Sequence, residues 1–123
     1  IDLGHSTIQF REDGIVEVNF ADELLLDVAE CKDLIINYSA ILVDKKAPIL
    51  HVLGKYMNVT KEAREFGASK EGLKFSLAEA YVLNSLAHKI LANFYLKFNK
   101  PKVPTQFFKT REEAIVWLLT FVK

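Results

Sequence analysis

The sequence predicts one α/β domain over residues 1–123, with a mixed, mostly parallel sheet of five strands and four helices in the order β-β-α-β-α-β-α-β-α. Two alternating apolar and polar segments, residues 6–11 and 15–20, flank an Asp-Gly pair that is typical of a tight hairpin turn. A continuous apolar run over residues 48–53 predicts a strand buried on both faces. Segments of helical periodicity separate the later strands, which favours parallel strands with right-handed crossovers.

Two helices follow from local signals on either side of that central strand. We expect Asp22 to cap the first helix, whose apolar side chains recur at three- and four-residue spacing from Leu24 to Leu42. The second helix is short. We expect Thr60 to cap it and Gly67 to end it.

Residues 73–84 fit two structures. Apolar side chains alternate there as in a strand, whereas Ser76 and Glu79 fit a capping box and two alanines favour a helix. The segment therefore forms either a strand followed by a helix from Ser85, or a single helix over residues 77–99. We favour the strand and then the helix, because a helix of about 23 residues would have twice the average length.

The last third of the chain predicts a helix, a strand over residues 105–109 and a final helix. Thr110 and Glu113 form the capping box of the final helix. The helix after Ser85 carries one apolar stripe. That stripe consists of Ala87, Ile90, Leu91, Phe94, Tyr95 and Phe98.

The composition argues against several classes of function. Sixteen basic residues balance sixteen acidic ones, which argues against a general nucleic-acid binder and against strong attachment to anionic lipid. The single cysteine, Cys31, excludes an internal disulfide and a cysteine-based zinc site, and it favours a reducing, cytoplasmic compartment. No apolar run approaches the ~18 residues that a transmembrane helix requires.

No catalytic or metal-binding motif accompanies the predicted fold. His5, His51 and His88 lie on separate elements, without the spacing of a metal site. Acidic residues fall mostly on helix surfaces and helix starts. We therefore expect no enzymatic activity, no metal and no cofactor, and structural roles for His51 and Cys31. An enzyme would require His51, Asn84 and a carboxylate to converge on one cavity.

The loop after the central strand is the main candidate site. Thr60 is a candidate phosphoacceptor or switch as well as a helix cap, because a helix N-terminus tolerates added negative charge. Asn84 and Ser85 form another helix start, at the end of a later parallel strand, and the free backbone N–H groups there could bind an anion. The candidates for contact with a partner or an anion are Lys55, Tyr56, Asn58, Asn84 and Ser85.

A basic loop near the end of the chain is a further candidate. Its lysines lie among phenylalanines, so it suits a phosphate or a lipid headgroup, although a solvated loop over the core explains the same pattern. The residues are Lys97, Lys100, Lys102 and Lys109, with Phe98, Phe107 and Phe108.

The order of elements resembles the STAS domain, the fold of sulfate transporters and anti-sigma-factor antagonists. The segments AYVLNSLAHKILANFYLKFNKPKVPT and TREEAIVWL are similar to stretches in small bacterial proteins of unknown function. In the antagonists, a serine or threonine at the start of the second helix is phosphorylated by a partner kinase, and by position Thr60 matches it. The sequence around Thr60 departs from the family's Asp-Ser-Ser/Thr-Gly motif, since the preceding Asp and the following Gly are missing.

Three hypotheses of function remain. The first is a non-catalytic regulatory module that binds a protein through residues 55–66 and is switched at the start of the second helix. The second is binding of a small molecule or a lipid in a crevice between the third helix and the sheet, since the chain is rich in Phe. The third and least favoured is an enzyme. A homodimer through an apolar helix face is compatible with each of them.

Overall fold

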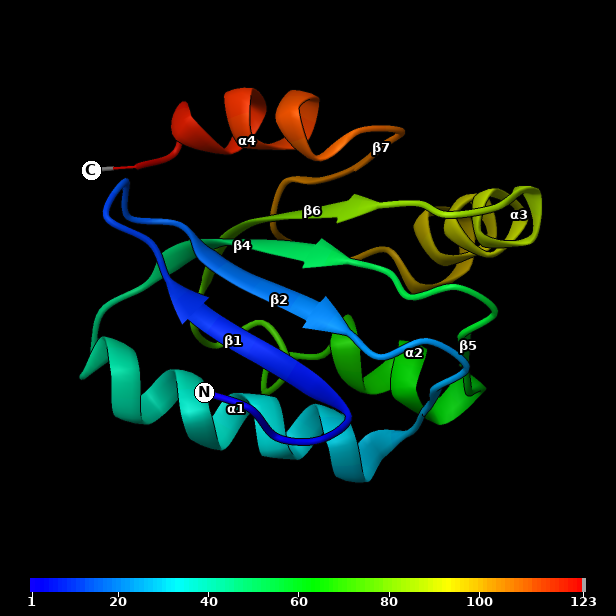
Figure 1. The fold of residues 1–123 in the computed structure, drawn as a ribbon, viewed down its shortest axis with the longest axis horizontal. Helices are drawn as coiled ribbons and strands as arrows, with labels where there is room; N and C mark the ends of the chain where they lie inside the picture. The colour runs from blue at the N-terminus through cyan, green and yellow to red at the C-terminus, as the bar shows by residue number, and fades with distance from the viewer. Residues whose placement is uncertain (123) are drawn as a thin grey trace.

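A five-stranded sheet with helices on both faces forms the core of the computed structural model, which describes residues 1–122. The strands lie in the order β1-β2-β4-β6-β7 (Figure 1), with β1 antiparallel to β2 and all other neighbours parallel. This confirms the predicted α/β class. The strands are β1 Ser6–Phe10, β2 Val16–Phe20, β4 Ala47–Val52, β6 Ser76–Val82 and β7 Thr105–Phe108.

The helices lie in separate layers. In Figure 1, α1 and α2 lie below the sheet and α4 lies above it, while α3 lies beyond the ends of β4 and β6. A π-helical turn, η1, continues α3 without a break. The bounds are α1 Val28–Leu42, α2 Lys61–Gly67, α3 Leu86–Phe94, η1 Tyr95–Asn99 and α4 Arg111–Leu119. Among these elements, none is both long enough and apolar enough to cross a bilayer.

Strand β4 is the centre of the sheet, as its apolar sequence predicts. Ile49 and Leu50 point to opposite faces, and both are fully buried. Ile49 packs in the core beneath α1, whereas Leu50 packs in the core beneath α4. Burial on both faces explains why this strand shows no alternation in the sequence.

The first helix begins later than the sequence indicates, and the prediction that Asp22 caps it is wrong. The cap is Asp27, which forms a full capping box with Glu30. Between Asp22 and Asp27 the chain forms β3 (Leu25–Leu26), which pairs with β5 (Asn58–Val59) in a second, two-stranded sheet. Asp22 instead accepts a hydrogen bond from the backbone N–H of Lys55. The pairing of β3 with β5 joins segments more than thirty residues apart, so no local sequence pattern predicts it.

Residues 76–82 form a strand, and a separate helix follows. β6 pairs with β4 on one side and with β7 on the other, so its backbone donors and acceptors are used within the sheet. Ser85 caps α3 by accepting the N–H of His88, and Thr110 caps α4 by accepting the N–H of Glu113. The interpretation as a strand and then a helix is therefore confirmed.

The predicted stripe of the third helix does not pack on the sheet as a unit. Leu91 and Tyr95 face inward, but Ile90 is 65% exposed and Phe98 is 61% exposed. The inward face of α3 and η1 also includes His88 and Ala92. Periodicity identifies an apolar face, but it does not say whether the protein itself covers that face.

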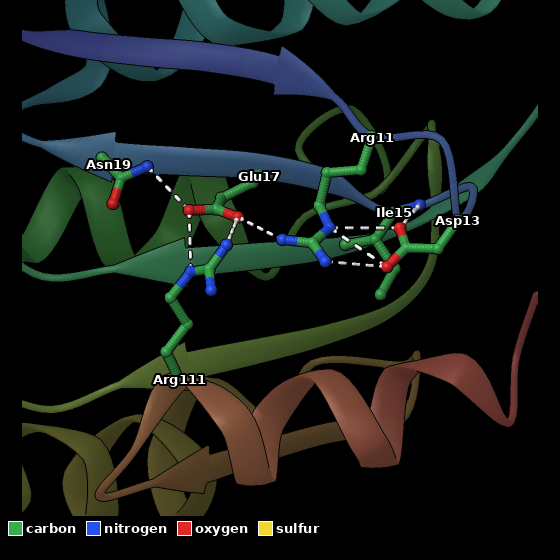
Figure 2. A network of polar contacts seen from close by, with 6 residues as sticks. All are labelled: Arg11, Asp13, Ile15, Glu17, Asn19 and Arg111. Carbon is green, nitrogen blue, oxygen red and sulfur yellow. Dashed lines mark hydrogen bonds and ion pairs between the residues drawn. The ribbon is translucent and has the colours of Figure 1, made fainter.

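An ion-pair network fastens α4 to the sheet (Figure 2). Glu17 of β2 is buried and accepts two hydrogen bonds from Arg111, at 2.6 and 3.0 Å, as well as one from Arg11 and one from Asn19. Arg11 also binds Asp13 in the hairpin turn. Burial alone would raise the pKa of Glu17, but the hydrogen bonds from Arg111, Asn19 and Arg11 lower it to about 2.

This network makes the free energy of unfolding of the domain depend on pH in the acidic range. Because the folded-state pKa of Glu17 lies below its usual 4.5, its contribution is complete above pH 4.5 and is lost as the pH falls toward 2. We expect Glu17→Gln to lower the free energy of unfolding by about 1–3 kcal/mol at pH 7, and by less at pH 3. Urea unfolding at both pH values measures this difference.

Glu65→Gln is the matched control, since Glu65 forms only an exposed pair with Lys61 at 3.9 Å. Its effect should stay below about 0.5 kcal/mol at either pH. Equal unfolding free energies for Glu17→Gln and the wild type at pH 7 would contradict the role of the network.

Candidate functional site

A cavity of about 110 Å³ lies between the sheet and the helices α1, α2 and α3. The sheet forms its floor and the helices form its roof. It therefore lies between the third helix and the sheet, where a crevice was predicted. Most of its surface is apolar. The side chains of the floor include Phe20, His51, Glu79, Tyr81 and Phe107, and those of the roof include Cys31, Tyr38, Ala63, Arg64, His88 and Tyr95.

A carboxylate lies in the floor of this cavity. Glu79 on β6 is only 4% exposed and accepts hydrogen bonds from the hydroxyls of Ser76 and Tyr81, each at 2.7 Å. No cationic side chain within residues 1–122 forms an ion pair with it. The Ser76–Glu79 pattern that resembles a capping box in the sequence is here a side-chain bond within a strand.

Tyrosine hydroxyls surround Glu79 and remain protonated. Burial raises the pKa values of Tyr38 and Tyr81 well above 10, and the nearby charge of Glu79 raises them further. The same two causes raise the pKa of Tyr95, and the nearby Tyr81 side chain opposes this shift in part. All three side chains therefore keep a proton that can be donated to an acceptor in the cavity.

Several polar atoms in the cavity wall lack a partner among the described residues. The hydroxyls of Tyr38 and Tyr95, the Nδ1 atom of His51 and the Nε atom of Arg64 are buried and have no partner with hydrogen-bond geometry. Both tyrosines are less than a tenth exposed. Since an unpaired buried polar group costs about 1–3 kcal/mol, four of them around one volume indicate a place for a molecule that supplies partners.

His51 is held as a neutral side chain. Its ring stacks on Tyr81, with centroids 4.4 Å apart, and lies 5.9 Å from the ring of Phe20. Burial lowers the pKa of His51, and neither Glu79 nor the backbone of Ala80 reverses this shift. The predicted core position is confirmed, and Nδ1 is available to a neutral hydrogen-bonding group.

Cys31 lines the cavity from α1. Burial, followed by the charges of Glu30, Asp27 and Glu79, raises the pKa of its thiol to about 12. The thiolate is the nucleophilic form of cysteine. At neutral pH this side chain is therefore a small apolar wall residue.

The arrangement expected of an enzyme is only half present. His51 and Glu79 line the same cavity, but Asn84 is exposed, and its amide donates to the carbonyl of Leu53 at 3.4 Å. Within residues 1–122, no group of three His, Cys, Asp or Glu side chains is arranged to hold a metal ion.

Thr60 caps α2 as predicted. Its Oγ1 accepts the backbone N–H of Ala63 at 3.0 Å, and its hydroxyl donates to Asp27 at 2.9 Å. Asp27 caps α1, so one hydrogen bond links the starts of the two helices. Both helices wall the cavity, α1 through Cys31 and α2 through Ala63.

The other candidate residues lie at one edge of the sheet, where β4 and β6 end (Figure 1). Lys55 and Tyr56 are exposed in the loop after β4, and Asn58 belongs to β5. The backbone N–H groups at the start of α3 already have partners inside the protein. The N–H of Asn84 donates to His88 Nδ1, and the N–H of His88 donates to the hydroxyl oxygen of Ser85. Two of the donors that an anion site would use are therefore already occupied.

Glu79 in the cavity floor was not among the residues predicted from the sequence. Glu79 occupies the one position in the alternating series from Leu77 to Leu83 that breaks its apolar character. Read as part of a strand, this position points to the same face as Tyr81, and an acid on a core-facing position is a signal for a buried site. Tyr38 and Tyr95 gave no such signal, because they fit apolar helix faces.

Comparison with one solved structure supports the fold. The chain is similar to an uncharacterised protein from Shewanella loihica PV-4, described as a member of the DUF3478 family with a SpoIIAA-like fold, with a TM-score of 0.60, 15% identity, and coverage of 92% of this chain and 91% of that chain. A protein of unknown function from Arthrobacter sp. FB24 is 20% identical over 91% of this chain and 97% of that chain, with a TM-score of 0.32. A search of curated sequences gave no match.

The first of these similarities confirms the STAS-like fold that the order of elements indicates, because the SpoIIAA-like fold is the anti-sigma-factor-antagonist form of that domain. At this level of identity the likeness concerns the fold alone. A family model described as "Domain of unknown function (DUF7793)" matches residues 8–122. The chain therefore belongs to the DUF7793 family.

Proposed function

We propose that this domain is a non-catalytic regulatory module that binds a small, largely apolar molecule in the cavity beneath α2 and α3. The observation that carries the proposal is the set of unpaired polar atoms, on Tyr38, His51, Arg64 and Tyr95, around a volume whose lining is mostly apolar. Ligand sites have this composition: apolar walls with a few polar groups that fix orientation.

The size and chemistry of the cavity limit the ligand. An engineered apolar cavity of about 150 Å³ in another protein binds benzene, so 110 Å³ suits a molecule of about one ring. Tyr38 and Tyr95 offer protonated hydroxyls, and Glu79 offers an acceptor. A neutral ring or short chain with one group that both donates and accepts fits these partners best.

The cavity is adjacent to the surface that we assign to a protein partner. Met57 and Val59 line the cavity, and His88 bonds to the carbonyl of Met57 at 3.1 Å. The exposed side chain of Tyr56 lies next to Met57 in the same loop, and it is 84% exposed. Aromatic side chains are enriched at protein interfaces. A molecule in the cavity therefore supports one arrangement of the loop over residues 55–60, and a partner that contacts Lys55, Tyr56 and Asn58 senses that arrangement.

Phenol and toluene test the proposed site, because they have nearly the same shape and differ in one hydrogen-bonding group. We expect calorimetry to show that phenol binds about tenfold more tightly than toluene, the value of one buried hydrogen bond. Tyr95→Phe and Tyr38→Phe should each reduce this preference. Tyr56→Phe, at an exposed tyrosine, should leave it unchanged. Absence of binding by either probe, or an equal effect of Tyr56→Phe, would contradict the proposal.

Thr60 supplies the proposed switch. A phosphate on its hydroxyl would take the place of the proton that it now donates to Asp27, and would set two negative groups against each other. This repulsion acts between the starts of α1 and α2, which both wall the cavity.

We therefore expect Thr60→Glu to lower the affinity for phenol at least fivefold and to lower the free energy of unfolding by about 1–2 kcal/mol. Thr60→Ser keeps the hydroxyl and serves as the control, with both quantities close to wild type. Calorimetry and urea unfolding of the three proteins provide the measurement. If Thr60→Glu binds phenol as the wild type does, the switch does not act on the cavity.

A further inference from the structure

An apolar stripe lies exposed along the outer face of α3 and η1. Leu86, Ile90, Phe94 and Phe98 follow one another at four-residue intervals and are between 45% and 74% exposed. The wider π-helical turn keeps Phe98 in line with the preceding residues, since its ring lies 4.5 Å from that of Phe94. Four large apolar side chains in one row exceed the scattered exposure that is normal for a protein surface.

Charge is segregated onto the same part of the chain. Residues 83–110 contain five lysines and no acidic residue. The rest of the chain therefore holds eleven basic residues against all sixteen acidic ones, a net charge of −5. The neutral total, which by itself argues against attachment to anionic lipid, hides this separation. The exposed lysines are Lys89, Lys97, Lys100, Lys102 and Lys109.

Cations lie beside the stripe. Lys97 lies over the ring of Phe98, with its Nζ 5.4 Å from the ring centroid, and Lys89, which precedes Ile90 in the chain, is also exposed. Arg64 of α2 adds a further cation, 5.3 Å from the ring centroid of Phe94. A row of large apolar side chains bordered by cations is the pattern of a helix that lies in the interface of an anionic membrane.

We propose that the outer face of α3 and η1 docks on an anionic lipid surface, with the apolar stripe at the boundary of headgroups and acyl chains and the lysines on the lipid phosphates. Charge complementarity favours this occupant over a second copy of the chain. A symmetric dimer through this face would bring the same lysines of both copies together, and like charges repel. The inference does not depend on a ligand in the cavity, since the stripe lies on the outer side of the helix.

Co-sedimentation with vesicles tests the proposal. Vesicles of phosphatidylcholine alone are compared with vesicles that contain phosphatidylglycerol at about a third of the lipid, each at low and high salt. We expect the full chain to partition at least tenfold more strongly onto the anionic vesicles, and high salt to remove most of this preference.

Two variants separate the apolar and the basic parts of the face. Ile90→Ser with Phe98→Ser, and Lys97→Gln with Lys100→Gln and Lys102→Gln, should each lower the partition coefficient about tenfold. The matched controls should stay within twofold of the wild type. They are Ile36→Ser with Val116→Ser, at side chains of similar exposure on α1 and α4, and Lys32→Gln with Lys45→Gln and Lys46→Gln.

Thermal unfolding of every variant establishes that it folds, and sedimentation velocity gives its oligomeric state. Wild-type monomer in solution with the expected partition supports the proposal. Three results would overturn it: no preference for anionic vesicles, an equal loss in the control variants, or a wild-type dimer that the stripe variant dissociates.

Discussion

The buried carboxylate of Glu79 is the central polar group on the face of the sheet that α1, α2 and α3 cover. It lies in the middle of a parallel sheet, where Ser76 and Tyr81 donate to it and no cation of the described chain neutralises it. Burial and this charge together keep the neighbouring tyrosines protonated. An apolar layer that contains such a group cannot close as an ordinary core does, because polar atoms left without partners oppose tight apolar packing. The cavity and its unpaired hydroxyls lie on the same face of the sheet as this carboxylate.

The two faces of the sheet solve the problem of buried charge differently. On the α4 face, Glu17 is met by Arg111 and Arg11, and the ion pairs fill the space. On the other face, Glu79 receives only hydroxyl donors, and a volume of about 110 Å³ remains. The first arrangement joins a helix to the sheet, whereas the second leaves room for another molecule. This contrast within one small domain is the reason that we assign a structural role to Glu17 and a binding role to Glu79.

The sequence predicted the elements that depend on short-range patterns. The Asp-Gly hairpin, the buried run of β4 and the caps at Thr60, Ser85 and Thr110 each involve residues within a few positions of one another. The true cap of α1 at Asp27 was missed because the pairing of β3 with β5 moves the helix start, and that pairing joins distant segments. The cavity was anticipated only as a crevice beside the third helix. Tyr38, His51, Glu79 and Tyr95 come from four different elements, α1, β4, β6 and η1, and no single-segment pattern contains them.

The third helix has two separate faces. Its inner face, with Leu91 and Tyr95, closes the cavity, while its outer face leaves Ile90 and Phe98 in solvent. Hydrophobic periodicity treats these two faces as one stripe, because it measures only the spacing of apolar residues. Exposure is a property of the folded chain, and it shows that the continuous helix of α3 and η1 covers a site on one side and presents a surface on the other.

A high-resolution crystal structure of the protein purified from its own source tests the central claim most directly. We expect electron density for a molecule other than water beside Glu79, within hydrogen-bonding distance of at least two of three atoms: the Tyr38 hydroxyl, the Tyr95 hydroxyl and His51 Nδ1. A cavity occupied by water alone would contradict it. So would a closed layer in which both tyrosine hydroxyls donate directly to Glu79.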